Sequence, residues 1–232
     1  MSLLSGISSL DNVMGGGLRE GAFTHVYGEA ASGKSTLGLV FVRAALRTSI
    51  GTIILNPETS SPIERLEQIV GKPFEEVADS VRIIVPKTFE EQGHIIEDIE
   101  LYLRDNTRLI IVDTLTKLYR VSLEDRERNY EAHRELNRQA GILKGIVKLR
   151  GLFLLVLNQV RGRIATGRHD FEPVAASIMD YWSDCTIRMD IGHVPSERII
   201  TRIEDGTVSK TCRLFLSRTG FVTEPAASER KK

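Results

Sequence analysis

The sequence predicts an α/β fold in which a mostly parallel, twisted sheet is flanked by helices and ends in an antiparallel edge. Three observations lead to this prediction. Short apolar runs alternate with longer helical patterns from Phe23 to Leu157. A Gly-x-x-x-x-Gly-Lys-Ser motif joins the first of these strands to the first helix. After Asp180 the strand-like runs follow one another closely, and Asp205-Gly206 is a hairpin signal between two of them.

The first half of the chain supplies most of the parallel strands. The runs 23–27, 52–55, 81–85 and 109–112 are short and apolar, as buried parallel strands are. The helix expected over 34–48 has one apolar stripe, and the helix over 63–70 begins after Pro62, which suits a first helical turn. A helix over 89–103 separates the third and fourth strands. Residues 8–21 read as a loop-rich segment because of their glycines.

The second half of the chain departs from the regular alternation of strands and helices. An irregular stretch follows Asp113, and then a long helix is expected over 129–149 and an apolar strand over 152–157. Residues 160–174 contain arginine and glycine without an apolar period, which predicts a flexible loop. Strands are expected at 185–191, 198–203 and 210–216. We divide the chain into a core of residues 1–224 and a polar tail of residues 225–232.

Composition limits the classes of partner. The 232 residues include 31 basic and 31 acidic side chains, so no overall charge draws the protein to nucleic acid or to a membrane. Cys185 and Cys212 fall on predicted strands and are expected to be reduced thiols. No apolar run approaches the roughly 18 residues of a membrane span. We therefore expect a cytoplasmic protein without a membrane partner.

The motif is a phosphate-binding loop in its expected setting, between a strand and a helix. Its glycines allow close approach of the backbone to a phosphate, and the amide N–H groups and the helix N-terminus face the anion. Lys34 can reach the β and γ phosphates of ATP, and the hydroxyl of Ser35 can bind Mg²⁺. The expected ATP-binding residues are Gly28, Glu29, Ala30, Ala31, Ser32, Gly33, Lys34, Ser35 and Thr36.

Asp113 is the expected second ligand for Mg²⁺. It ends the apolar strand over 109–112, and acids at the carboxyl ends of such strands face the ligand crevice of open α/β sheets. The alternative is an aspartate that only caps the following helix.

Two further residues at strand ends complete a candidate hydrolase. Glu58 follows the second strand and can orient or deprotonate the attacking water. Gln159 follows the strand over 152–157 and can sense the γ phosphate and relay its presence to the adjoining loop. The alternatives are a helix N-terminal acid for Glu58 and a loop hydrogen bonder for Gln159.

From Ser8 to Val222 the chain resembles the RecA/RadA recombinase core, and most of all the archaeal RadA paralogues of the RadB and RadC type. The resemblance lies in the glycine-rich lead-in at 15–17, the phosphate loop, Glu58, Tyr119-Arg120, the Leu157–Val160 segment and Tyr181-Trp182. It implies that Glu58 is catalytic and that Arg120 begins a first DNA-facing loop. It also implies that the strand of Gln159 lies between those of the phosphate loop and Asp113.

Some segments depart from the pattern of the family. Asn56-Pro57 stands where recombinases usually have Asp-Thr, and Ala175-Ala176 stands where paired glycines usually close the second DNA-facing loop. Phe41 and Ala44 match the letters of a polymerisation motif, but they fall on the apolar stripe of a predicted helix and are interpreted as core. We expect no long filaments from the chain alone.

Contact with single-stranded DNA is expected from local positive charge. Arg161, Arg163, Arg168 and His169 cluster after Gln159, and Arg120 joins them through the resemblance. The stretch 117–150 is also basic. For that stretch the alternative is a solvated helix with intrahelical ion pairs, and for the arginine-rich loop it is an ordinary surface loop.

These expectations combine into one hypothesis with two rivals. The chain is expected to be a weak ATPase, using ATP and Mg²⁺, whose turnover DNA can stimulate. It would assist or modulate a full-length RadA-type recombinase in recombination and repair near the nucleoid. The first rival is a KaiC-like signalling ATPase, although such proteins carry two adjacent catalytic glutamates and this chain has Pro57-Glu58-Thr59. The second is a nucleotide-dependent interaction module without useful turnover.

Overall fold

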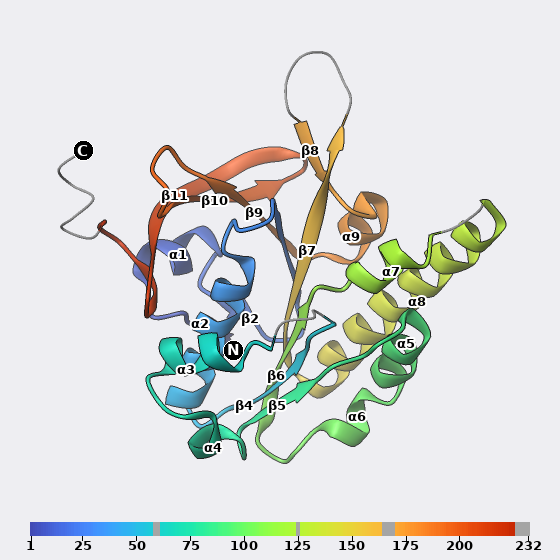
Figure 1. Cartoon of the computed structure of the whole chain (residues 1–232), viewed down its shortest axis with the longest axis horizontal. Helices are drawn as coiled ribbons and strands as arrows, with labels where there is room; N and C mark the ends of the chain where they lie inside the picture. Colours follow the sequence, from blue (N-terminus) through green and yellow to red (C-terminus); the bar gives the residue numbers. More distant parts are fainter. Residues whose placement is uncertain (58–60, 124–125, 164–169, 226–232) are drawn as a thin grey trace.

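The computed structural model describes residues 1–57, 61–123, 126–163 and 170–225, without the side chains of 126–128, 163 and 170, and it has the predicted α/β fold (Figure 1). Within these residues ten strands form one sheet in the order β12-β11-β10-β9-β3-β7-β6-β4-β5, with β8 paired to β7. The strands are β1 (Ser2–Leu3), β2 (Leu18–Arg19), β3 (Phe23–Gly28), β4 (Gly51–Leu55), β5 (Val81–Ile84), β6 (Thr107–Asp113), β7 (Phe153–Arg163), β8 (Asp170–Pro173), β9 (Cys185–Ile191), β10 (Glu197–Glu204), β11 (Thr207–Ser217) and β12 (Gly220–Val222).

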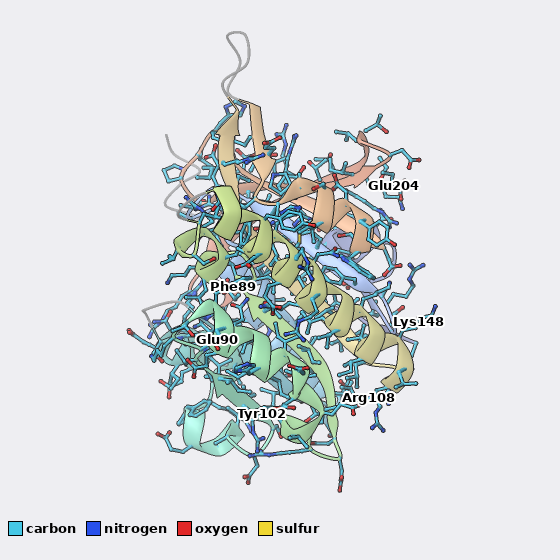
Figure 2. All side chains as sticks on the ribbon, turned by 90° about the vertical axis from the view of Figure 1, so that its right-hand side faces the viewer. Phe89, Glu90, Tyr102, Arg108, Lys148 and Glu204 are labelled. Carbon is cyan, nitrogen blue, oxygen red and sulfur yellow. The ribbon has the colours of Figure 1, made fainter. Side chains whose placement is uncertain are left out.

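Helices cover both faces of the sheet. They are α1 (Ser8–Val13), α2 (Lys34–Arg47), α3 (Ile63–Val70), α4 (Phe74–Val77), α5 (Phe89–Glu97), α6 (Ile99–Tyr102), α7 (Lys117–Val121), α8 (Arg126–Arg150) and α9 (Ala176–Trp182). The first four lie on one face, and α5 to α9 lie on the other (Figure 1). In Figure 2 the second face is turned to the viewer, with Phe89 and Glu90 at the start of α5 beside the long α8, and Lys148 near the end of α8.

The alternation of side chains along each strand divides the core in two. On β6, Leu109 and Ile111 face the core with α2, whereas Ile110 and Val112 face the core with α5 and α8. All four side chains are at most 2% exposed. A strand that is apolar on both faces is therefore required here, as the continuous apolar run predicted.

The sheet order brings the predicted site residues to one edge. Strand β7 lies between β3, which leads into the phosphate loop, and β6, which ends at Asp113. The order that the resemblance implied is therefore correct. Strand β9 runs parallel to β3, so the antiparallel edge begins one strand later, at β10. The β10–β11 hairpin turns at Asp205 (φ 49°) and Gly206 (φ 74°), and this positive-φ pair explains the Asp-Gly signal.

Several helix and strand boundaries differ from those predicted from the sequence, because tertiary contacts set them. The helix expected over 89–103 divides at Asp98 into α5 and α6, and the lead-in expected to be a loop contains α1. The irregular stretch after Asp113 contains α7. The loop expected over 160–174 is in part an antiparallel hairpin, because β7 continues to Arg163 and pairs with β8. The region after that hairpin forms α9.

No helix of the described residues is both long enough and apolar enough to cross a membrane. The division into a core of 1–224 and a tail of 225–232 stays a prediction, since residues 226–232 lie outside the described part. The last strand ends at Val222.

Candidate functional site

The phosphate loop connects β3 to α2 through a backbone that only a few residue types adopt easily. Gly28 ends the strand, and Gly33, with φ 95°, precedes the first residue of the helix. Ala31 also has a positive φ of 60°. Left-handed residues at two points turn successive amide groups of the loop toward one side, which is the arrangement that binds phosphate.

The two motif glycines are required because the loop packs closely against strands β9 and β12. A Cβ on Gly28 would collide with the carbonyl oxygen of Met189 on β9 and lie 2.7 Å from Ser32 Oγ. A Cβ on Gly33 would lie 3.1 Å from the ring of Phe221 on β12. The loop is therefore pressed against the C-terminal strands, and the close backbone approach that phosphate binding needs is built into the fold.

Lys34 curls back into its own loop. Its Nζ donates to the carbonyl oxygens of Gly28 (2.9 Å) and Glu29 (2.7 Å), and the residue is 8% exposed. Ser32, which is fully buried, lies 3.4 Å from the same ammonium group. The cation is thus held at the centre of the loop, where a bound phosphate would face it.

A residue that the sequence did not single out anchors the loop from the antiparallel edge. Arg198 of β10 is 5% exposed and donates through Nη2 to the carbonyl oxygen of Ala31 (2.9 Å). Its Nη1 donates to the carbonyls of Pro195 and Glu197, both at 2.7 Å. Burial lowers the pKa of Arg198 from its usual value. Because Arg198 and Ala31 are far apart in sequence, only their meeting in space reveals this role.

Ser35 and Asp113 line the same small cavity, where the metal ion is expected. Its volume is about 20 Å³, and Asn56, at the end of β4, also lines it. A hydroxyl and a carboxylate oxygen are the hard donors that Mg²⁺ prefers, and the cavity can hold about one small ion or water. The residues present therefore fit Mg²⁺ bound with a nucleotide.

Gln159 stands directly beside the loop, because it pairs in register with Gly28 across β3 and β7. Its Oε1 accepts a hydrogen bond of 2.7 Å from Nη1 of Arg120 on α7. Arg161, two residues further along β7, forms an ion pair of 2.6 Å with Glu172 on β8. Arg120, Gln159 and Arg161 are thus gathered on one flank of the site, which we call the hairpin flank: α7, the β7–β8 hairpin and the turn into α9.

Several predicted site residues are not tested by this geometry. Glu58, Arg168 and His169 lie outside the described residues, and Arg163 is described only by its backbone at the end of β7. Gln159, Arg120 and Arg161 are therefore the described members of the expected sensor and DNA contacts.

The basic stretch over 117–150 is less available than its composition suggested. Arg138 contacts Glu97 and Glu135, Arg150 contacts Glu100, and Lys144 contacts Asp184. Of these pairs, Arg138–Glu135 lies within the helix, as the alternative expected, and the others join α8 to α5, to α6 and to Asp184.

Other groups singled out from the sequence have structural roles. Phe41 and Ala44 are buried in the core, as expected. Trp182 donates from its indole N–H to Asn137 (2.9 Å) and packs against Gly141 of α8, so it joins α9 to α8. Cys185 and Cys212 are free thiols, and burial raises the pKa of Cys212 to about 11, which keeps that thiol protonated.

The parallel sheet, the phosphate loop at the end of β3 and the acid at the end of β6 define a RecA-type nucleotide-binding core. The chain belongs to the Rad51 family, whose sequence model matches residues 1–220.

Individual relatives agree with this assignment. The DNA repair and recombination protein RadB of Methanococcoides burtonii is 29% identical over 94% of this chain and 96% of its own length. That of Methanothermobacter thermautotrophicus is 29% identical over 92% of this chain and 90% of its own. The crystal structure of a RadB recombinase superposes with a TM-score of 0.76 at 27% identity, covering 94% and 98% of the two chains. The prediction of a RadA paralogue is confirmed, in its RadB form.

Proposed function

We propose that this protein is an ATP-binding recombinase paralogue that hydrolyses ATP slowly, binds single-stranded DNA weakly, and modulates a full-length RadA-type recombinase during recombination and repair. It would act in the cytoplasm, at the nucleoid. The observation that carries the proposal is the direct hydrogen bond between Gln159, at the nucleotide edge, and Arg120, on the flank expected to face DNA. The similarity to proteins named for DNA repair and recombination supports it.

The nucleotide half of the proposal assigns a role to each residue at the strand ends. The loop amides of residues 28–36 would bind the phosphates, and Lys34 would exchange its loop carbonyls for phosphate oxygens. Ser35 and Asp113 would hold Mg²⁺, which when bound neutralises the charge that develops on the phosphates. Glu58 would orient or deprotonate the attacking water, as the sequence predicts. Gln159 would sense the γ phosphate.

The second half of the proposal is that the protein binds DNA only weakly, because the arginines expected to contact DNA already have partners within the protein. Arg120 is shared with Gln159 and Arg161 with Glu172, so each cation must leave or share a partner before it meets a DNA phosphate. The binding should therefore be modest, tolerant of sequence and strongly dependent on salt.

The experiment combines three measurements on the purified chain. Fluorescent ATP titration measures nucleotide affinity, phosphate release measures turnover, and anisotropy of a labelled oligo-dT measures DNA binding between 50 and 200 mM salt, roughly the range over which such contacts weaken steeply. Alanine at Arg161, Arg163 and Arg168 together should flatten the salt slope by up to about 3. Wild-type affinity and slope in this triple variant would move DNA binding to the 117–150 stretch, which includes Arg120, or remove it altogether.

A nucleotide-dependent interaction module remains the second candidate, because one observation favours it. The described cations of α8 and the hairpin are largely paired with carboxylates, which lowers the attraction for DNA. ATP binding without measurable turnover or DNA affinity would select this candidate over the first.

A further inference from the structure

Asn158 lies at the end of β7, directly before Gln159, and its side chain is fully buried. Its Nδ2 donates to the carbonyl oxygen of Val174 (2.9 Å), at the turn from β8 into α9. Its Oδ1 accepts a short hydrogen bond from the hydroxyl of Thr116, the residue before α7. A buried side chain thus joins β7 to two segments of the hairpin flank, the start of α7 and the turn into α9. Both helices lie beside β7 in Figure 1.

A third partner fixes the orientation of the amide. Nδ2 of Asn158 lies 3.3 Å from Nε2 of His25, on the neighbouring strand β3. His25 is completely buried, and this burial lowers its pKa to about 3, so the ring is neutral at physiological pH. Nε2 can then accept from the amide, which leaves the ring proton on Nδ1, a buried atom without a hydrogen-bond partner among the described residues. Each polar atom of the Asn158 side chain is therefore used.

Backbone hydrogen bonds run beside the same connections. The N–H of Val174 donates to the carbonyl of Gln159 (3.0 Å), and the N–H of Leu115 donates to the carbonyl of Leu157 (3.3 Å). Both segments are therefore attached to the end of β7 twice, once by backbone and once through Asn158.

We propose that Asn158 is a positioning residue that couples the nucleotide site to both segments of the hairpin flank. The inference rests on the proposed nucleotide binding, because a displacement of the β7 end would start where Gln159 meets the γ phosphate. An aliphatic side chain would fill the same space, but it would leave Thr116, Val174 and His25 with buried polar groups unpaired. The amide therefore makes the two segments respond as one unit.

Hydrogen–deuterium exchange with a non-hydrolysable ATP analogue and Mg²⁺ tests the coupling without relying on activity. In the wild type the nucleotide should slow exchange about tenfold or more at residues 28–36, 114–121 and 174–182, since locally ordered amides open less often. In Asn158→Leu the slowing should persist at 28–36 and disappear at the other two segments. Thr201→Val is the control for the loss of a buried polar group, because the Thr201 hydroxyl of β10 is buried and meets Thr211 on β11, away from both segments.

Thr116→Val keeps the test decisive if Asn158→Leu does not fold. It removes only the hydroxyl, so the response should be lost at 114–121 and kept at 174–182. An unchanged response at 114–121 in Thr116→Val, or protection of both flank segments in a folded Asn158→Leu, would overturn the inference. Wild-type protection confined to 28–36 would overturn it as well and leave the proposed function intact. No wild-type protection at 28–36 would overturn both.

Discussion

The phosphate loop and the hairpin flank lie on either side of Gln159, and they are held in different ways. The loop is fixed by buried groups: Lys34 inside it, Arg198 behind it, and the backbone of Met189 against Gly28. The hairpin flank is also attached to β7 by the buried Asn158, but its charged side chains form exposed contacts, such as Arg161 with Glu172 and Arg120 with Gln159. Buried hydrogen bonds resist salt, whereas exposed ion pairs are screened by it.

The contrast shows how one small core can combine a nucleotide site held by buried contacts with a surface whose ion pairs can exchange partners. Nucleotide affinity should depend little on salt, and DNA affinity should depend on it strongly. Between the two regions lies the buried polar group of His25 and Asn158, which belongs to neither surface. The predictions that follow test each region and the boundary between them.

The largest effect is expected in the loop itself. Lys34→Ala should lower ATP affinity about 100-fold or more, because hydrogen bonds from a charged donor contribute roughly 1.5–3 kcal/mol each. Fluorescent nucleotide titration and phosphate release measure the change. Lys210→Ala is the control, since Lys210 bonds Asn12 on α1, away from the loop. Unchanged hydrolysis in Lys34→Ala would show that the nucleotide binds elsewhere.

The buried His25, between the two regions, should make the free energy of unfolding depend on pH. The folded pKa of His25 is lowered to about 3, so the folded protein binds fewer protons than the unfolded chain below the unfolded value of 6.5. This contribution is fully present above about pH 6.5 and is lost as the pH falls toward 3. Between pH 7 and pH 5 the loss should be about 2 kcal/mol.

Urea unfolding at the two pH values measures this loss. His25→Gln carries no titrating group at the position, so it should lose about 2 kcal/mol less than the wild type on the same change of pH. Equal losses in the two proteins would mean that His25 is accessible to protons in the folded state.

The anchor behind the loop should have the next largest effect. Arg198→Met should weaken ATP binding about tenfold, because the carbonyl of Ala31 loses its charged donor and the loop relaxes. Arg213→Met serves as the control on the same group of strands, since the side chain of Arg213 is 69% exposed and pairs with Glu197, the neighbour of Arg198, at 3.8 Å. A wild-type affinity in Arg198→Met would limit Arg198 to the stability of the β9–β10 turn.

On the hairpin flank, Ala175 precedes α9 with a left-handed backbone, φ 52° and ψ 45°. Ala175→Gly should relieve roughly 1 kcal/mol of strain, offset in part by the greater freedom of glycine in the unfolded chain. A rise of several tenths of a kcal/mol in the free energy of unfolding is therefore expected from urea titration. Ala176→Gly, at the first residue of α9, relieves no such strain and should not stabilise the protein. Destabilisation in both variants would contradict the prediction.

The smallest effect is expected from the surface pairs of the hairpin flank. Glu172→Gln releases Arg161 and removes one negative charge, so affinity for oligo-dT should rise a few-fold and the salt slope should steepen by about 1. Glu204→Gln is the matched control, because Glu204 also pairs with an arginine, Arg202, within β10. Equal changes in both variants would point to overall charge and not to the flank.

The sequence by itself determined the elements whose signals are local. The phosphate loop, the apolar strand ending at Asp113 and the helix 63–70 follow from short-range rules of backbone conformation and side-chain periodicity, and the structure places them as expected. The turn at Asp205-Gly206 is of the same kind, because two adjacent residues with positive φ need that chemistry wherever they occur.

Only the tertiary structure decided the contacts that cross the sheet. Arg198 meets Ala31, and Asn158 meets His25, because the sheet order places their strands or loops together, although the partners are more than 100 residues apart in sequence. The β7–β8 hairpin was hidden for a related reason: its polar residues carry no apolar alternation, and cross-strand pairing gives them their order. Periodicity reports which side of a segment is buried, but the partner on that side is fixed by topology.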